Sequence, residues 1–153
     1  MDTNKRKPVV LIADDDPDDQ LMIREAFEQL CVNCHLRFVS DGVELLAYLQ
    51  RKAAPCRQAN GCPLPDLLLL DLNMPLKDGR QALLEIRSDP ALKGLPIVVL
   101  TTSKNDEDKD FCLAQGAKDY IVKPIRYSEL LDIVDTLQVY WSEQEMNPAG
   151  NKS

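Results

Sequence analysis

Four apolar runs of strand length are each followed by polar or ionisable residues. The residues that follow them are Asp14, Asp15, Asp71, Thr101 and Lys123. Continuous apolar runs, such as the four leucines at 67–70, are typical of strands that are buried on both faces of a sheet. Parallel strands place their carboxyl ends along one edge of the sheet, so we expect these five side chains to lie close together.

The predicted cluster holds three carboxylates and one ammonium group, which indicates a bound cation. Two carboxylates about 5 Å apart repel by roughly 3 kcal/mol at an effective dielectric constant of 20. Lys123 supplies a single positive charge, which does not balance Asp14, Asp15 and Asp71. A small set of oxygen ligands suits a Mg²⁺ ion that keeps several of its waters. The backbone carbonyl of Asn73, in the irregular loop after Asp71, can add one more ligand.

Mg²⁺, an ammonium group and a hydroxyl group around a carboxylate are suited to phosphoryl transfer. A carboxylate is a competent phosphoryl acceptor. In this interpretation Asp71 is the nucleophile, Mg²⁺ and Lys123 neutralise charge, and Thr101 donates to the phosphoryl oxygens. Each residue alone also has a simpler explanation as a helix cap, a turn residue or a solvated charge. The prediction therefore depends on all five residues reaching the same edge of the sheet.

The segments between the apolar runs have helical patterns, so strands and helices alternate. The predicted strands cover residues 9–13, 35–39, 66–70, 96–100 and 120–122. Two predicted helices begin at Asp16-Pro17 and at Ser40-Asp41, and three others cover about 79–87, 105–115 and 130–141. Residues 53–65, rich in proline, form a long loop. This (βα)5 order predicts an α/β fold: a doubly wound, five-stranded parallel sheet with right-handed crossovers and helices on both faces.

Composition limits the classes of partner. The 153 residues include 25 acidic and 18 basic side chains, and the net charge of −7 argues against nucleic acid as a direct partner. No apolar stretch is long enough to span a membrane, and no signal-peptide pattern is present, so we expect a cytoplasmic protein. We expect an N-terminal extension at 1–7, one domain at 8–145 and a disordered tail at 146–153.

The five cysteines form an odd count, which fits free thiols in a reducing compartment. Residues 31–35 match the C-x-x-C-H pattern of haem attachment, and Cys56 and Cys62 could complete a zinc site with Cys31 and Cys34. Covalent haem attachment requires export, and the spacing of Cys56 and Cys62 is loose for zinc. Inert thiols are the favoured interpretation.

The cluster and the order of its residues resemble the receiver domain of two-component response regulators, over about residues 8–140. The matching residues are Asp14, Asp15, Asp71, Thr101, Lys123 and Pro124. The resemblance implies that Asp71 accepts a phosphoryl group from a histidine kinase, and that such a protein assists its own phosphorylation but is not an enzyme. It also implies that Asp15, Asp71 and the Asn73 carbonyl bind Mg²⁺ directly and Asp14 through water. In the family the bond before Pro124 is commonly cis, and Tyr120 matches the aromatic switch position.

A narrower resemblance is to the cyanobacterial phytochrome response regulators, carried by the segments at 41–44, 71–79 and 100–103 and by the proline-rich insertion before the third strand. It implies a stand-alone receiver that a phytochrome histidine kinase phosphorylates and that tends to form homodimers. We expect the output to leave through the face of the fourth helix, fifth strand and fifth helix. The expected dimer residues are Phe111, Tyr127, Val139, Tyr140 and Trp141.

Three other functions share parts of this pattern. A phosphatase of the haloacid dehalogenase type needs a second acid two residues after its nucleophile, where this chain has Asn73. A flavodoxin-like electron carrier needs a phosphate loop after the first strand, where three aspartates would repel the phosphate of FMN. A pseudo-receiver, which binds partners without taking phosphate, usually lacks one of the five groups. Phosphorylation in the presence of Mg²⁺ separates these possibilities.

Overall fold

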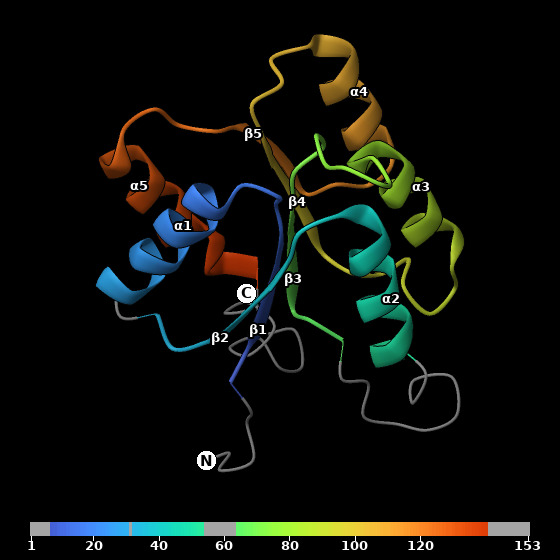
Figure 1. Ribbon diagram of the computed structural model, residues 1–153, viewed down its shortest axis with the longest axis horizontal. Coiled ribbons are helices and arrows are strands. Elements are labelled where there is room, and N and C mark those ends of the chain that lie inside the picture. The colour runs from blue at the N-terminus through green and yellow to red at the C-terminus, as the bar shows by residue number, and fades with distance from the viewer. Residues whose placement is uncertain (1–6, 31, 54–63, 141–153) are drawn as a thin grey trace, which may run out of the picture.

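A computed structural model describes residues 7–30, 32–53 and 64–140 of the chain. Five parallel strands form one sheet in the order β2-β1-β3-β4-β5 (Figure 1). The strands are β1 (Val9–Ala13), β2 (His35–Val39), β3 (Leu67–Leu70), β4 (Ile97–Thr101) and β5 (Asp119–Val122). The helices are α1 (Pro17–Gln29), α2 (Gly42–Ala53), α3 (Gly79–Ser88), α4 (Asp106–Ala114) and α5 (Tyr127–Leu137). The predicted doubly wound fold is confirmed.

The helices cover the two faces of the sheet in groups of two and three. Helices α1 and α5 lie on one face, and α2, α3 and α4 lie on the other (Figure 1). Alternate residues of each strand contribute to the two hydrophobic clusters, so Leu69 packs with α1 and α5 while Leu68 and Leu70 pack with the other helices. All four leucines of β3 are buried. Complete burial of a leucine side chain contributes about 1.5–3 kcal/mol, so the central strand is firmly held.

Strand pairing continues for one residue beyond the strands and aligns their carboxyl ends. Ala13 pairs with Leu70, and Leu70 pairs with Val99. The backbone N–H of Asp71 donates to the carbonyl of Ala13 at 3.0 Å. The backbone N–H of Asp14 likewise donates to Val39 at 3.0 Å. These bonds fix the main chain of Asp14 and Asp71 relative to each other.

Side-chain caps begin four of the helices, and α2 is capped by Asp41, which accepts from the backbone N–H of Glu44 at 2.7 Å. Asp16 accepts from the backbone N–H of Asp18 at 2.9 Å, Asp78 accepts from Arg80 at 2.7 Å, and Asn105 accepts from Glu107 at 2.7 Å. Such caps satisfy N–H groups that have no partner within the helix. The helix starts predicted at Asp16-Pro17, Ser40-Asp41 and Asn105 are confirmed.

Several boundaries and one peptide bond differ from the sequence-based predictions. Thr101 is the last residue of β4, and that strand starts after Pro96, which has no N–H to donate. Helix α5 is assigned only to Leu137, and Trp141 lies outside the described residues. The cis peptide bond expected before Pro124 is not found, because the described residues include no cis peptide bond. The bond is trans, the form that X–Pro bonds intrinsically prefer. The predicted N-terminal extension at 1–7, apart from residue 7, and the predicted tail at 146–153 lie outside the described residues.

Candidate functional site

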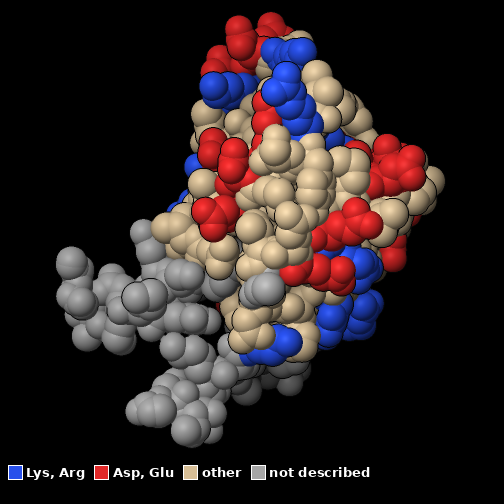
Figure 2. Space-filling view, turned by 90° about the vertical axis from the view of Figure 1, so that its left-hand side faces the viewer, with Lys and Arg blue, Asp and Glu red and all other residues tan. Residues whose placement is uncertain are grey.

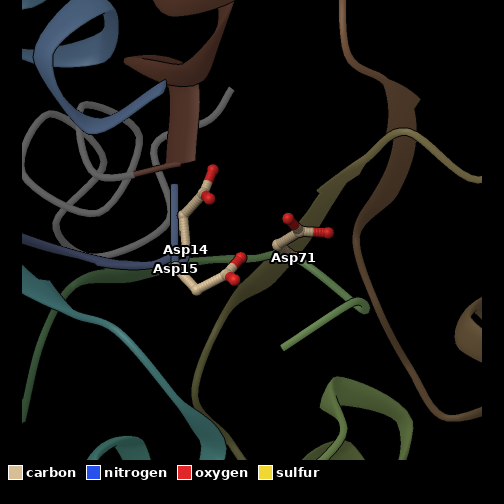
Figure 3. Close-up of side chains that lie close together, drawn as sticks. All are labelled: Asp14, Asp15 and Asp71. Atoms are coloured by element: carbon tan, nitrogen blue, oxygen red, sulfur yellow. The ribbon is translucent and has the colours of Figure 1, made fainter. Parts of the chain in front are cut away.

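Three aspartates meet at the carboxyl edge of the sheet. Asp14 and Asp15 follow β1, and Asp71 follows β3 (Figure 3). One carboxylate oxygen from each lies within 4.8 Å of the others. Asp14 is 2 % exposed and Asp71 is 5 % exposed, whereas Asp15 is open to solvent. The predicted convergence of these carboxylates is therefore present in the fold.

Lys123 follows β5, and its ammonium group lies among the carboxylates of the cluster. Its Nζ atom lies 2.9 Å from Asp14 Oδ2 and 2.8 Å from Asp71 Oδ2. It also lies 2.6 Å from Oδ2 of Asp19, which is on α1. An ammonium group has three N–H donors, so these three carboxylates occupy all of them. Asp19 is a member of the site that the sequence analysis missed, because only the position of α1 beside the end of β5 brings it there.

The charges of the cluster act on one another strongly. Burial, assisted by the charge of Asp71, raises the pKa of Asp14 to about 6, against opposing hydrogen bonds from Asp16 and Lys123. Burial alone would lower the pKa of Lys123, but hydrogen bonds to Asp19, Asp71 and Asp14 outweigh it and raise that pKa. The site therefore holds a permanently charged ammonium group among carboxylates that it does not fully neutralise.

The donor set fits a small divalent cation. Oδ1 of Asp14 accepts from the backbone of Asp16 at 3.0 Å, and Oδ1 of Asp71 accepts from the backbone of Asn73 at 3.2 Å. Each carboxylate oxygen has two lone pairs, so these contacts leave acceptor capacity on both side chains. Carboxylate oxygens are the ligands that hard cations such as Mg²⁺ and Mn²⁺ prefer. The residues that could hold such an ion are those of the three-aspartate group.

The loop that carries Asn73 is held close to the site by the start of α3. Asn73 is exposed, and its side-chain amide lies 3.4 Å from Oγ1 of Thr102. A Cβ atom on Gly79 would lie 2.4 Å from the backbone oxygen of Asp71, a distance that real side chains do not tolerate. The backbone N–H of Gly79 donates to Leu72 at 2.9 Å. Glycine at this position therefore allows α3 to pack directly against the chain after β3.

Thr101 and Tyr120 lie on the β4 and β5 side of the site. The Thr101 side chain is buried, and its Oγ1 accepts from the backbone N–H of Ser103 at 3.3 Å. The ring of Tyr120 is turned into the fold at 8 % exposure, and its hydroxyl donates to the Ser103 carbonyl at 2.9 Å. Ser103 thus connects Thr101, the predicted donor to the phosphoryl oxygens, with Tyr120, which matches the aromatic switch position.

The five residues predicted for a dimer face have different surroundings. Phe111 packs against the cluster under α2, α3 and α4, whereas Tyr127 and Tyr140 pack against the cluster under α1 and α5. The Tyr127 hydroxyl also donates to Gln29 at 3.1 Å. Val139 is 44 % exposed. Trp141 is among the residues that are not described.

The cysteines that are described lie apart from the aspartate cluster. Cys34 is half-buried, Cys112 is buried, and both are free thiols. Burial raises the pKa of each to about 11, so neither thiol is activated. The zinc and haem alternatives also need Cys31, Cys56 and Cys62, which lie outside the described residues.

Comparison with known proteins places this geometry in a family. Residues 10–135 match the model of the response regulator receiver domain. The chain belongs to the response regulator receiver family. Receiver-domain proteins are in general phosphoacceptors of two-component signalling rather than classical enzymes.

Individual receivers resemble the chain over nearly its whole length. Response regulator Rcp1 of Synechocystis sp. is 32 % identical over 97 % of this chain and 98 % of its own. The crystal structure of the phosphorylated cyanobacterial phytochrome response regulator RcpA has a TM-score of 0.77 at 36 % identity, covering 91 % of this chain and 96 % of its own. The Mn²⁺-bound form of Rcp1 has a TM-score of 0.74 at 33 % identity, covering 88 % of this chain and 94 % of its own.

These likenesses confirm the predicted receiver fold and the resemblance to phytochrome response regulators. They favour a receiver over the haloacid dehalogenase and flavodoxin alternatives. Among the described helices of this receiver, none has the length and apolar content needed to cross a bilayer.

Proposed function

We propose that Asp71 of this receiver accepts a phosphoryl group from a histidine kinase in a reaction that depends on Mg²⁺. One observation carries the proposal: Asp71 is buried at the carboxyl edge of the sheet, within reach of Lys123 and two further aspartates. A buried carboxylate beside an ammonium group and a cation site is suited to accept a phosphoryl group and to keep it.

The transfer itself needs few groups from the protein. A carboxylate oxygen of Asp71 forms the new bond to phosphorus. The bond from phosphorus to the imidazole nitrogen of the kinase histidine breaks, and its electron pair stays on that nitrogen. Lys123 is already 2.8 Å from Asp71, so its ammonium group can follow the charge onto the phosphoryl oxygens. Thr101 supplies a hydroxyl donor from β4.

Asp14, Asp15 and Asp71 would hold the cation, with the backbone carbonyl of Asn73 as a further ligand. When bound, the ion supplies charge neutralisation for the phosphoryl oxygens. The presence of Mn²⁺ in the structure of Rcp1 supports a divalent ion, and the all-oxygen donor set supports Mg²⁺. Asp14 belongs to this group through water in our proposal, and Asp15 and Asp71 through direct contact.

The signal is proposed to leave through the face formed by α4, β5 and α5. A phosphoryl group on Asp71 would draw the hydroxyl of Thr101 toward it and favour the inward position of Tyr120. Such a ligand shifts an equilibrium between two arrangements that already exist. We propose a homodimer through the same face, where Leu113, Val122, Ile125 and Val139 expose apolar surface.

We propose that this receiver is cytoplasmic and that its kinase is a bacterial phytochrome, since RcpA is a phytochrome response regulator and resembles this chain over 91 % of its length. Exposed aliphatic side chains on α1 and on the loops after β3 and β5 offer the kinase a surface beside the site. They are Leu21, Leu76 and Ile125, which are 53 %, 80 % and 94 % exposed. A pseudo-receiver that binds a partner without phosphate is the alternative.

Incubation with acetyl phosphate tests the proposal directly. We expect intact-protein mass spectrometry to show one added phosphoryl group with Mg²⁺ and none with a chelator. Asp71→Asn should abolish the addition, whereas Asp132→Asn, on the exposed side of α5, should leave it unchanged. A wild-type protein that takes no phosphoryl group would support the pseudo-receiver.

A further inference from the structure

An ion pair connects α3 and α4, two helices that lie side by side on one face of the sheet (Figure 1). The guanidinium group of Arg80 donates through Nε and Nη2 to the two carboxylate oxygens of Asp108, both at 2.7 Å. This two-point geometry fixes direction as well as distance. The pair therefore differs from the single-contact ion pairs that contribute little on protein surfaces.

The Asp108 end of the pair holds the loop between β4 and α4. Oδ2 of Asp108 also accepts from the hydroxyl of Ser103 at 2.7 Å. Ser103 is the residue that donates to Thr101 Oγ1 and accepts from the hydroxyl of Tyr120. Any movement of Asp108 away from Ser103 therefore removes one of the restraints on the loop between β4 and α4, whose residue Ser103 contacts both Thr101 and Tyr120.

The Arg80 end is anchored to the chain that carries Asp71. Nη1 of Arg80 donates to both oxygens of Asp78, at 2.9 and 3.1 Å, and Asp78 caps α3. Gly79, the first residue of α3, packs against the backbone of Asp71. These contacts link the chain segment that follows Asp71 to Ser103, through Arg80 and Asp108.

The pair is charged and only partly exposed. Hydrogen bonds from Arg80 and Ser103 lower the pKa of Asp108 to about 2. The side chains of Arg80 and Asp108 are 32 % and 18 % exposed. Solvent screens such a pair in part, so its effect on the loop matters more than its contribution to global stability.

We propose that Arg80 and Asp108 are positioning residues for phosphorylation, which hold Ser103 where the Thr101 hydroxyl faces the acceptor and the Tyr120 ring stays inward. With the Thr101 oxygen accepting from Ser103, the hydroxyl proton is left to donate to a phosphoryl oxygen. The proposal rests on the phosphoacceptor function stated above. Neither residue touches the phosphoryl group itself.

Amide hydrogen exchange in the unphosphorylated protein tests the restraint without any phosphoryl donor. Asp108→Asn keeps an acceptor for Ser103 but removes the charge that holds Arg80. We expect exchange of the segment 102–106 to rise at least threefold in this variant, with exchange in β3 unchanged. The matched control is Glu107→Gln, which removes the same charge from the neighbouring exposed position of α4. Exchange equal to that of the control would overturn the proposal.

Kinetics with acetyl phosphate test the consequence. We expect Asp108→Asn and Arg80→Gln each to lower the phosphorylation rate three- to tenfold at saturating Mg²⁺, with the half-saturating Mg²⁺ concentration unchanged. The double variant should be no slower than the slower single variant, because both remove the same restraint. A loss of stability with a wild-type rate would mean that the pair only joins two helices, and would contradict the proposal. If the wild type takes no phosphoryl group, the proposed function fails while the exchange result still stands.

Discussion

At the scale of single residues, the buried carboxylate of Asp14 destabilises the metal-free fold. Asp14 is almost completely buried beside Asp71, and its pKa is raised to about 6. A carboxyl group with a raised pKa binds its proton more tightly in the folded state than in the unfolded state. Its ionised form therefore lowers the free energy of unfolding at neutral pH. Such a cost is typical of a site that is arranged for binding a cation rather than for stability.

We predict that Asp14→Asn stabilises the metal-free protein at pH 7.5 by about 1–3 kcal/mol, since one pKa unit corresponds to 1.36 kcal/mol. The gain should shrink as pH falls from about 6 toward 4, where the wild-type carboxyl also becomes neutral. Urea titrations in a chelator at both pH values measure this difference. Asp132→Asn is the control. An Asp14→Asn variant that is less stable than the wild type at pH 7.5 would contradict the claim that the Asp14 carboxylate destabilises the metal-free fold.

The sequence predicted most of this cluster, because strand ends follow from topology. Asp14, Asp71 and Lys123 each follow a strand, and their convergence needs only a parallel sheet. Asp19 could not be predicted in the same way, since its place beside Lys123 depends on how α1 packs. The Arg80–Asp108 ion pair could not be predicted from the sequence for the same reason, since its two residues are 28 positions apart on different helices.

At the scale of elements, α3 packs closely against the chain after β3, and this packing sets the shape of the loop that follows Asp71. Gly79 has no room for a side chain, whereas Gly94, in the loop before β4, has no atom within 4 Å of where a Cβ would lie. The sequence indicated a polar break at Asp78-Gly79, but it could not show which backbone atoms would approach it. Element types were predicted correctly, and boundaries shifted by a few residues, as at Thr101.

We predict that Gly79→Ala lowers the free energy of unfolding by about 1–3 kcal/mol, the usual cost of overpacking. It should also slow phosphorylation, because the Asp71 backbone must move to relieve the contact. Gly94→Ala should leave both properties near those of the wild type. Thermal unfolding and the acetyl phosphate reaction give the two measurements. Equal behaviour of the two variants would show that the contact at Gly79 is relieved at no cost.

At the scale of the whole molecule, acidic side chains dominate the face that α1 and α5 form. Helices α1 and α5 carry seven acidic residues, four and three respectively, against the single basic residue Arg24. Acidic side chains lie on both sides of an uncharged area on this face, and basic side chains lie above and below it (Figure 2). Such a surface does not favour an anionic partner. The sequence predicted aromatic residues for the dimer face, but Phe111 and Tyr127 are half-buried in their own domain, so aliphatic side chains supply more of the exposed apolar surface.

We predict that Val139→Glu weakens the proposed homodimer at least tenfold, since it places a charge on the face of α4, β5 and α5. Leu21→Glu, on α1, is the matched control at similar exposure. Sedimentation of the phosphorylated and unphosphorylated proteins over a range of concentrations measures the change. A wild type that remains monomeric in both states at high micromolar concentration would contradict the homodimer.

The most direct test of the central claim locates the phosphoryl group on the chain. Borohydride reduces an aspartyl phosphate to homoserine, and peptide mass spectrometry then identifies the modified residue. After reaction with acetyl phosphate and Mg²⁺, we expect homoserine at position 71 and unmodified aspartate at positions 14, 15 and 19. Homoserine at any of those other positions, with Asp71 intact, would contradict the account.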